Sequence, residues 1–141
     1  EIMRILPVAG GPVRQVKSTL TVEDMQIPKN WWVMPSIYVT HENDPVTKID
    51  GDNSHMDLVE GFKPQRWLDE KTRPKEYMPW GASYRFCAGH ILAMAEMKTF
   101  LAVFCREVKG FDLVNVDNHD KIKWKFSAIC TPKDGVLISI K

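Results

Sequence analysis

The sequence predicts an α+β fold in which short strands are arranged around two helices. The first observation is an apolar helical pattern over residues 91–108, with apolar side chains three and four residues apart. The second is a set of short alternating segments, typical of half-buried strands, before and after that helix. The third is a loop rich in glycine and aromatic residues, residues 79–90, which leads directly into the helix.

Composition and charge limit the classes of protein to which this chain can belong. Its 141 residues are enough for one domain with a core, and 44% hydrophobic and 26% charged residues are ordinary for a globular protein. A net charge of +1 without a basic stripe argues against nucleic acid as a partner. Three cysteines without paired spacing indicate free thiols and a reducing compartment. The sequence has no run of 18 apolar residues that would span a membrane.

The first residues already have a helical pattern. Residues 1–6 are predicted to be a helix that Pro7 and the glycines after it end. We therefore expect the chain to be the C-terminal part of a longer protein. Glu1 and Arg4 are three residues apart and hence neighbours on one face of this helix. By pattern alone they form an exposed ion pair worth about 0.3 kcal/mol.

Residues 13–41 are predicted to form mostly strands. Residues 14–17 and 19–22 alternate loosely, as half-buried strands do, and residues 31–34 and 37–39 are predicted to be the returning strand. A turn separates the two pairs, because Pro28 fixes φ and Asn30 tolerates the left-handed region. Two histidines of this half are interpreted as ordinary polar residues, His41 hydrogen-bonded in a loop and His55 in a surface turn.

The long helix after Gly89 has a stripe of apolar residues at helical spacing. The stripe consists of Ala93, Met97, Phe100, Leu101, Phe104 and Val108. Such a stripe predicts packing into a core, and Cys105 on the same helix is predicted to be a buried, inert thiol. Three further strands are predicted, over residues 111–114, 123–126 and 135–140.

Cys87 is the candidate for chemistry, because it lies just before the predicted helix. The macrodipole and the free backbone N–H groups of a helix N-terminus favour negative charge, and hence the thiolate form that ligates metals. Arg85, two residues earlier, adds a cation suited to a carboxylate.

This loop closely resembles the cysteine loop of cytochromes P450, where an aromatic residue, a glycine, an arginine, the cysteine and a second glycine recur at this spacing. The resemblance implies the C-terminal portion of the mostly α-helical P450 fold, with residues 1–141 as a partial P450 domain. It also implies haem b as cofactor, with the iron held by the Cys87 thiolate. The other residues expected at the haem are Arg14, Trp80, Gly81, Arg85, Phe86, Ala88 and Gly89.

The resemblance assigns roles to four of these residues. Arg14 and Arg85 are expected to neutralise the haem propionates. Trp80 and Phe86 are expected to pack near the sulfur and limit solvent, which tunes the redox potential. For Arg14, an ordinary solvated position at a strand edge remains the alternative.

Three positions of the loop depart from the family's usual residues. Trp80 stands where Phe is commoner, Ala88 where Pro is frequent, and Ser83 where Gly is usual. The backbone turns sharply at the last of these positions, and a residue other than glycine is strained at positive φ. The loop is therefore expected to be either locally reshaped at Ser83 or less stable.

A second motif resembles the family's Glu-x-x-Arg pair, which a further arginine completes as a buried triad. Glu1 and Arg4 match the pair, and Arg66 in the segment over residues 62–67 matches the further arginine. Guanidinium groups share a carboxylate well because they bind it in a planar, bidentate manner. The resemblance thus implies a buried structural triad of Glu1, Arg4 and Arg66 in place of the exposed ion pair.

The activity implied by the resemblance is that of a haem-thiolate monooxygenase, which inserts one oxygen atom from O₂ into an apolar organic substrate, sterol- or retinoid-like. Residues 127–131 are then expected to line the substrate pocket. The implied partners are a small apolar substrate and an NADPH-dependent reductase or other electron donor. A basic rim of Lys71, Arg73, Lys75 and Arg106 would receive the donor, unless these are simply solvated charges. Membrane attachment, at the endoplasmic reticulum if the source is eukaryotic, would use an anchor outside this chain.

Two alternatives stay open at this point. One is a P450-like isomerase or dehydratase that uses the thiolate without O₂. The other is a truncated, non-catalytic P450 fragment that binds haem weakly or only interacts with a partner. The 141 residues alone are expected to be inactive as an oxygenase, because the family's oxygen-activating acid–threonine pair lies in an earlier segment.

Overall fold

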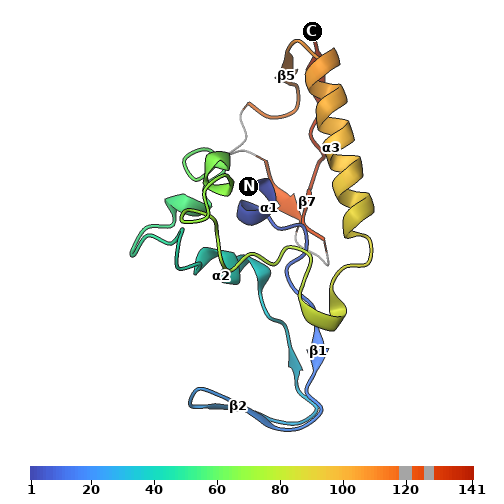
Figure 1. Cartoon of the computed structure of the whole chain (residues 1–141). Helices are drawn as coiled ribbons and strands as arrows, with labels where there is room; N and C mark the ends of the chain where they lie inside the picture. Colours follow the sequence, from blue (N-terminus) through green and yellow to red (C-terminus); the bar gives the residue numbers. More distant parts are fainter. Residues whose placement is uncertain (118–121, 126–128) are drawn as a thin grey trace. The chain divides into compact units, whose positions relative to one another are not determined.

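Two compact units make up the chain, residues 1–81 and residues 82–141 (Figure 1). The computed structural model describes residues 1–117, 122–125 and 129–141. The first unit contains α1 (Ile2–Ile5), β1 (Arg14–Gln15), β2 (Leu20–Val22), β3 (Met25–Ile27), β4 (Trp32–Val33), α2 (Ile37–Glu42) and the 3₁₀ helices η1 (Ser54–Met56) and η2 (Pro64–Trp67). The second contains η3 (Ser83–Arg85), α3 (His90–Glu107), β5 (Phe111–Leu113), β6 (Trp124–Lys125), β7 (Thr131–Pro132) and β8 (Ile138–Ile140).

Two antiparallel ladders follow one another along one hairpin of the first unit, which Figure 1 shows with β1 and β2 labelled. β1 pairs with β4, and further along the hairpin β2 pairs with β3. The turn predicted before the returning strand is present, since Asn30 has φ +72° and the Trp31 N–H donates to the Pro28 carbonyl at 3.3 Å. The tip of the hairpin at Glu23, with φ +52°, and the short strand β3 were not predicted.

The prediction of a strand over residues 37–39 was wrong, because these residues begin α2. Ser36 caps the helix: its side-chain oxygen accepts the Val39 N–H at 3.2 Å, and its carbonyl accepts the Thr40 N–H. A capping serine satisfies one of the free N–H groups of a helix start. The burial of Ile37, 2% exposed, adds packing that outweighs the strand preference of isoleucine and valine.

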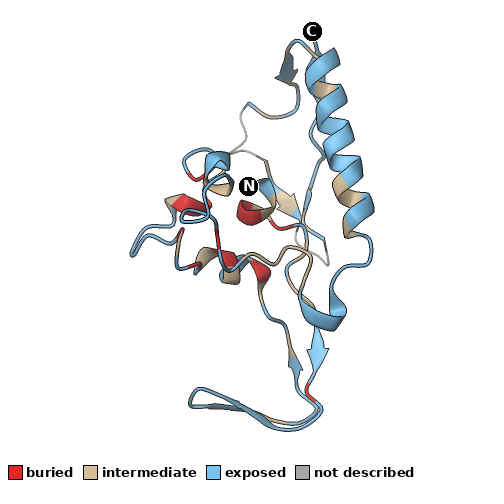
Figure 2. Ribbon diagram, viewed as in Figure 1, coloured by how far each residue is buried: buried red, intermediate tan, exposed pale blue. Residues whose placement is uncertain are grey.

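The core of the first unit contains many polar side chains (Figure 2). Its buried apolar members are Ile5, Val16, Ile37 and Met56, and its buried polar members are Arg4, His41, Asp44, Thr47 and His55. The prediction that His55 lies in a surface turn was therefore wrong. Its ring nitrogens face the carbonyls of Asp52 and Glu42, at 3.2 and 2.9 Å. Turn-forming residues around it predicted the local backbone but carried no information about what packs over it.

The long helix is confirmed as α3, but the predicted burial of its apolar stripe is not. Phe100 is 64% exposed and Leu101 is 49% exposed, and Cys105 is exposed, which contradicts its prediction as a buried thiol. Phe104 makes the aromatic contacts of the stripe, with ring centroids 5.7 Å from Phe100 and 5.6 Å from Phe111. Periodicity identifies the face of a helix that is suited to burial, but burial also needs a covering layer. The described residues leave most of this face uncovered.

The strands after α3 form two antiparallel pairs, β5 with β8 and β6 with β7. The predicted strands over residues 111–114, 123–126 and 135–140 are each present in part. Phe126, at the end of the second, lies outside the described residues, as do Ser127 and Ala128 of the loop predicted to line the substrate pocket. No helix within the described ranges is long and apolar enough to cross a membrane.

We expect Gly61→Ala to destabilise the first unit. A Cβ at Gly61 would lie 2.5 Å from the His55 carbonyl oxygen and 2.7 Å from that of Asp57, so the backbone would have to move. Overpacking of this kind costs about 1–3 kcal/mol. Urea unfolding measures the cost, and Gly10→Ala is the matched control, since a Cβ there meets nothing within 4 Å. Equal stability of the two variants would contradict the expectation.

Candidate functional site

The predicted ligand, Cys87, lies in the second unit between η3 and α3. η3 is closed by the Phe86 N–H, which donates to the Ser83 carbonyl at 3.0 Å, and the His90 N–H donates to the Cys87 carbonyl at 3.3 Å. The Cys87 thiol is free and exposed, three residues before the first residue of an 18-residue helix. The loop therefore presents an accessible sulfur at a helix N-terminus, where negative charge is favoured.

Ser83 has φ +55°, so the loop keeps the sharp turn that glycine usually makes at this position. Ser83 therefore adopts the left-handed conformation in which glycine is favoured, in keeping with the expectation of a less stable loop. Such a conformation costs a residue with a Cβ about 1–2 kcal/mol. The loop therefore contains local strain four residues before Cys87.

Gly89 and an aromatic pair, Phe86 with His90, flank Cys87 in the sequence of the loop. A Cβ added at Gly89 would lie 3.9 Å from Cys87 Sγ, an ordinary van der Waals contact. Phe86 and His90 form an edge-to-face pair with ring centroids 4.7 Å apart. Phe86 itself remains 46% exposed, so this pair leaves the outer face of the loop accessible.

The remaining residues predicted at the cofactor are spread over both units. Trp80 and Gly81 end the first unit, where Gly81 has φ +76° and its N–H donates to the Met78 carbonyl at 3.0 Å. Arg14 is exposed on β1, and its guanidinium donates to the carbonyl of Val13 at 2.9 Å. Arg85 and Ala88 are exposed in the second unit.

Glu1, Arg4 and Arg66 are brought together in the first unit. Glu1 Oε1 lies 3.0 Å from Arg4 Nη2 and 3.0 Å from Arg66 Nε, and its Oε2 accepts the Trp67 indole N–H at 2.8 Å. Burial would raise the pKa of the Glu1 carboxyl, but the bonds from Arg4 and Trp67 outweigh it and lower the pKa. The interpretation of Glu1 and Arg4 as an exposed pair is therefore wrong, since both side chains are almost completely buried.

The Arg4 guanidinium also bonds to the main chain beyond α1. Its Nη2 donates to the His55 carbonyl at 2.5 Å and to the Gly61 carbonyl at 3.2 Å, while Nη1 contacts the Met56 sulfur at 3.2 Å. Removing one partner of a buried charge pair costs about 3–5 kcal/mol, because the other charge is left without compensation. This cluster consequently joins α1 to η1 and η2.

His41 is the first of two functional candidates that the sequence did not single out. It lies in the last turn of α2, where a loop was predicted, and it is fully buried. Its Nδ1 lies 2.9 Å from the Arg4 carbonyl, and its Nε2 lies 3.0 Å from the Met78 amide nitrogen. A carbonyl on one side and an N–H on the other require neutral imidazole with the proton on Nδ1. The predicted hydrogen bonding of His41 is thus confirmed.

Asp44 is the second candidate, and its carboxylate accepts four backbone N–H groups. Oδ1 accepts those of Val46 and Thr47 at 2.9 and 3.0 Å, and Oδ2 accepts those of Lys75 and Glu76 at 2.6 Å each. Burial would raise the pKa of Asp44, but these four bonds outweigh it and lower the pKa. The signal that could have found both residues is the polar run over residues 41–45, with a histidine close before an Asp-Pro pair.

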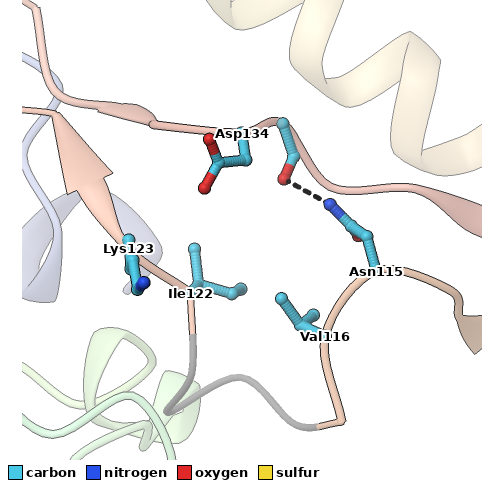
Figure 3. A pocket seen from close by; sticks show the side chains of 6 residues that line it. Asn115, Val116, Ile122, Lys123 and Asp134 are labelled. Atoms are coloured by element: carbon cyan, nitrogen blue, oxygen red, sulfur yellow. Dashed lines mark hydrogen bonds between the residues drawn. The ribbon is translucent and has the colours of Figure 1, made fainter.

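The second unit also contains a small cavity of about 150 Å³ (Figure 3). Its lining residues are Asn115, Val116, Ile122, Lys123, Asp134 and Gly135. Asn115 is held in place by donating to the Gly135 carbonyl at 3.2 Å. Pockets for organic ligands start at about 300 Å³, so this cavity is too small to be the functional site.

We expect Ser83→Gly to stabilise the protein by about 0.5–1 kcal/mol, because glycine adopts positive φ without strain and the gain exceeds its extra entropy in the unfolded chain. Urea unfolding measures the change. Ala82→Gly is the control, since Ala82 has φ −144° and its replacement by glycine should destabilise. A loss of stability in Ser83→Gly as well would show that the turn at residue 83 is unstrained.

We also expect acid to weaken the first unit through His41. Burial lowers the pKa of His41 below its usual 6.5. The hydrogen bond to the Arg4 carbonyl and the Asp44 charge oppose this shift, while the charge of the Arg4 guanidinium adds to it. A group whose folded pKa is lowered contributes stability above its unfolded pKa and loses it as the pH falls toward the folded value. Wild-type stability in urea should fall as the pH is lowered below about 6.5, and it should fall less in His41→Gln, which does not titrate there. Identical pH profiles would contradict this.

Comparison with known proteins places these features in a family. The family model for cytochrome P450 matches residues 1–138. Cytochrome P450 26B1 of Xenopus tropicalis is 33% identical over 117 residues, which are 80% of this chain and 21% of that protein. Beta-amyrin 6-beta-monooxygenase of Solanum lycopersicum is 28% identical over 141 residues, which are all of this chain and 27% of that protein. The chain thus spans about a fifth to a quarter of the length of these relatives.

Solved structures of cytochromes P450 also match this chain. The retinoic acid-bound cyanobacterial CYP120A1 matches with a TM-score of 0.77 and 24% identity, over 99% of this chain and 31% of that one. A six-coordinated cytochrome P450 from Thermus thermophilus matches with a TM-score of 0.70 and 22% identity, over 99% of this chain and 34% of that one. These likenesses confirm the predicted fold class, a mixed helix and strand portion of the P450 fold. With the family model matching nearly every residue, this chain belongs to the cytochrome P450 family.

Proposed function

We propose that this chain supplies the haem-thiolate ligand of a monooxygenase that inserts one oxygen atom from O₂ into an apolar organic substrate. The observation that carries the proposal is the free, exposed sulfur of Cys87, in a loop that keeps the left-handed turn at Ser83. Because the chain spans 21% and 27% of two relatives, the activity is proposed for the complete protein. The 141 residues alone are expected to be inactive as an oxygenase.

The residues of the loop fit the haem iron that cytochromes P450 contain. A cysteine thiolate holds the iron in cytochromes P450, and Cys87, which is free and exposed, would supply it here. Gly89 lies beside the sulfur, where an added Cβ would be in ordinary van der Waals contact with Sγ at 3.9 Å. Cys105 is also free and exposed, but it lies inside α3, where no open loop surrounds its sulfur.

The other side chains would neutralise the haem propionates and shield the sulfur from water. Arg14 and Arg85 are both exposed and would pair with the two propionates. Trp80 and Phe86 would exclude water from the sulfur, while Gly81, Ala88 and Gly89 would let the main chain approach closely. Haem, when bound through a thiolate, supplies the oxygen chemistry, and the protein supplies the ligand, its orientation and the exclusion of water.

The substrate is proposed to be apolar and sterol- or retinoid-like. One solved structure is bound to retinoic acid, and the tomato relative is named for oxidation of beta-amyrin. An NADPH-dependent reductase or another electron donor would supply electrons, received by a basic rim of Lys71, Arg73, Lys75 and Arg106. Membrane attachment through a segment outside this chain, at the endoplasmic reticulum in a eukaryotic source, completes the proposal.

The reduced, CO-bound absorption spectrum of the protein expressed from its full reading frame tests this function. We expect a red-shifted Soret band, typical of thiolate ligation, and its loss in Cys87→Ala because no other residue of the loop can supply the thiolate. Cys105→Ala is the matched control, since it removes an equally free and exposed thiol and should leave the band unchanged. A band at the position typical of imidazole ligation in the unmutated protein would refute the assignment of Cys87.

A further inference from the structure

We propose that His41 and Asp44 are positioning residues for the cysteine loop, because together they hold the main chain of residues 75–78, here called the approach segment. This inference rests on the proposed function of Cys87 as haem ligand. The approach segment is followed directly by Pro79, Trp80 and Gly81, with which the loop begins. Neither positioning residue touches the reacting atoms in this inference, and both act through the backbone.

Asp44 fixes the first half of the approach segment. Its Oδ2 accepts the N–H groups of Lys75 and Glu76, both at 2.6 Å, across 31 and 32 residues of sequence. Hydrogen bonds to an ionised carboxylate are shorter and about twice as strong as neutral ones. The Asp44 side chain is fully buried, and its other oxygen is held by the N–H groups of Val46 and Thr47. The carboxylate therefore cannot turn away without losing bonds on both oxygens.

His41 fixes the second half of the approach segment. Its Nε2 accepts the Met78 N–H at 3.0 Å, and its Nδ1–H donates to the Arg4 carbonyl at 2.9 Å. The ring of Tyr77 stacks on the imidazole at a centroid distance of 5.4 Å. The Tyr77 ring also packs edge-on against the Trp67 ring, at a centroid distance of 4.6 Å. The approach segment is thus tied through His41 to the main chain of α1.

Side chains, and not a neighbouring strand, satisfy these three backbone N–H groups of the approach segment. These three hydrogen bonds are partly buried, so the position of the segment depends on two side chains at and just after the end of α2. The Met78 carbonyl in turn accepts the Gly81 N–H at 3.0 Å, in a turn where Gly81 has φ +76°. A displacement at Met78 is therefore transmitted by covalent and hydrogen bonds to the start of the cysteine loop.

Three substitutions test the His41 and Asp44 hydrogen bonds separately. His41→Gln places an amide oxygen near the position of Nε2 and retains an acceptor for Met78, whereas His41→Asn retains only a group near the position of Nδ1. Asp44→Asn leaves one acceptor oxygen for four N–H donors. Asp69→Asn is the matched control, because Asp69 is exposed and its Oδ1 accepts the N–H of nearby Lys71 at 2.9 Å.

The test is the reduced, CO-bound spectrum of the haem-loaded protein expressed from its full reading frame. We expect the ratio of the imidazole-type to the thiolate-type Soret band to rise about fivefold or more in Asp44→Asn and His41→Asn, as the loss of one hydrogen bond would cause. It should stay near the wild-type value in His41→Gln and Asp69→Asn. A structural role without positioning would lower stability in urea and leave this ratio unchanged in the folded fraction.

The outcomes are distinguishable. A wild-type protein without the thiolate-type band overturns the proposed function. A wild-type band with unchanged ratios in Asp44→Asn and His41→Asn, or with equal losses in His41→Gln and His41→Asn, overturns the positioning role alone. If the variants do not fold, hydrogen exchange in the wild-type protein decides the matter. Protection of the amides of Lys75, Glu76 and Met78 comparable to that of α3 supports the inference, and rapid exchange refutes it.

Discussion

The first unit is organised by the buried guanidinium of Arg4. A cation that is completely removed from water must be compensated by opposite charge and by acceptors in fixed directions. Arg4 finds these in the Glu1 carboxylate and in the carbonyls of His55 and Gly61. The absence of a side chain at Gly61 allows this close approach, since a Cβ there would collide with the His55 carbonyl. One side chain thereby determines how α1, η1 and the residues after η1 fit together.

A series of hydrogen bonds connects the main chain of Arg4 to Gly81, at the start of the cysteine loop. The Arg4 carbonyl accepts from His41, His41 accepts from Met78, and the Met78 carbonyl accepts from Gly81. Because each bond specifies a direction as well as a distance, the path leaves little freedom at Gly81. A ligand site requires its residues to be held within about 0.5 Å, which explains the use of directional bonds in place of apolar packing.

Sequence features that are local to the backbone predicted the structure well. The periodicity of α3 and the capacity of Asn30 for positive φ each depend on a few neighbouring residues, whereas the sharp turn at Ser83 was implied by the family resemblance. The meeting of Arg66 with Glu1 was predicted by a family pattern, since no local rule brings residues 65 positions apart together. Burial was predicted poorly in both directions, for His55 and for Phe100, because it depends on which other segments cover a residue. The helix α2 was not predicted, because its first residues prefer strands and the N-terminal cap by Ser36 outweighs that preference.

The cysteine loop contains a strained residue, Ser83, and the approach segment before it, residues 75–78, is held by side-chain hydrogen bonds. A left-handed serine costs about 1–2 kcal/mol and persists only where the surrounding structure holds the backbone in place. Within the first unit, Asp44 orders the chain before the loop, because its carboxylate accepts the N–H groups of Lys75 and Glu76 at 2.6 Å each. The positioning role proposed for His41 and Asp44 would extend this restraint along the chain to a loop in which serine stands where glycine is usual.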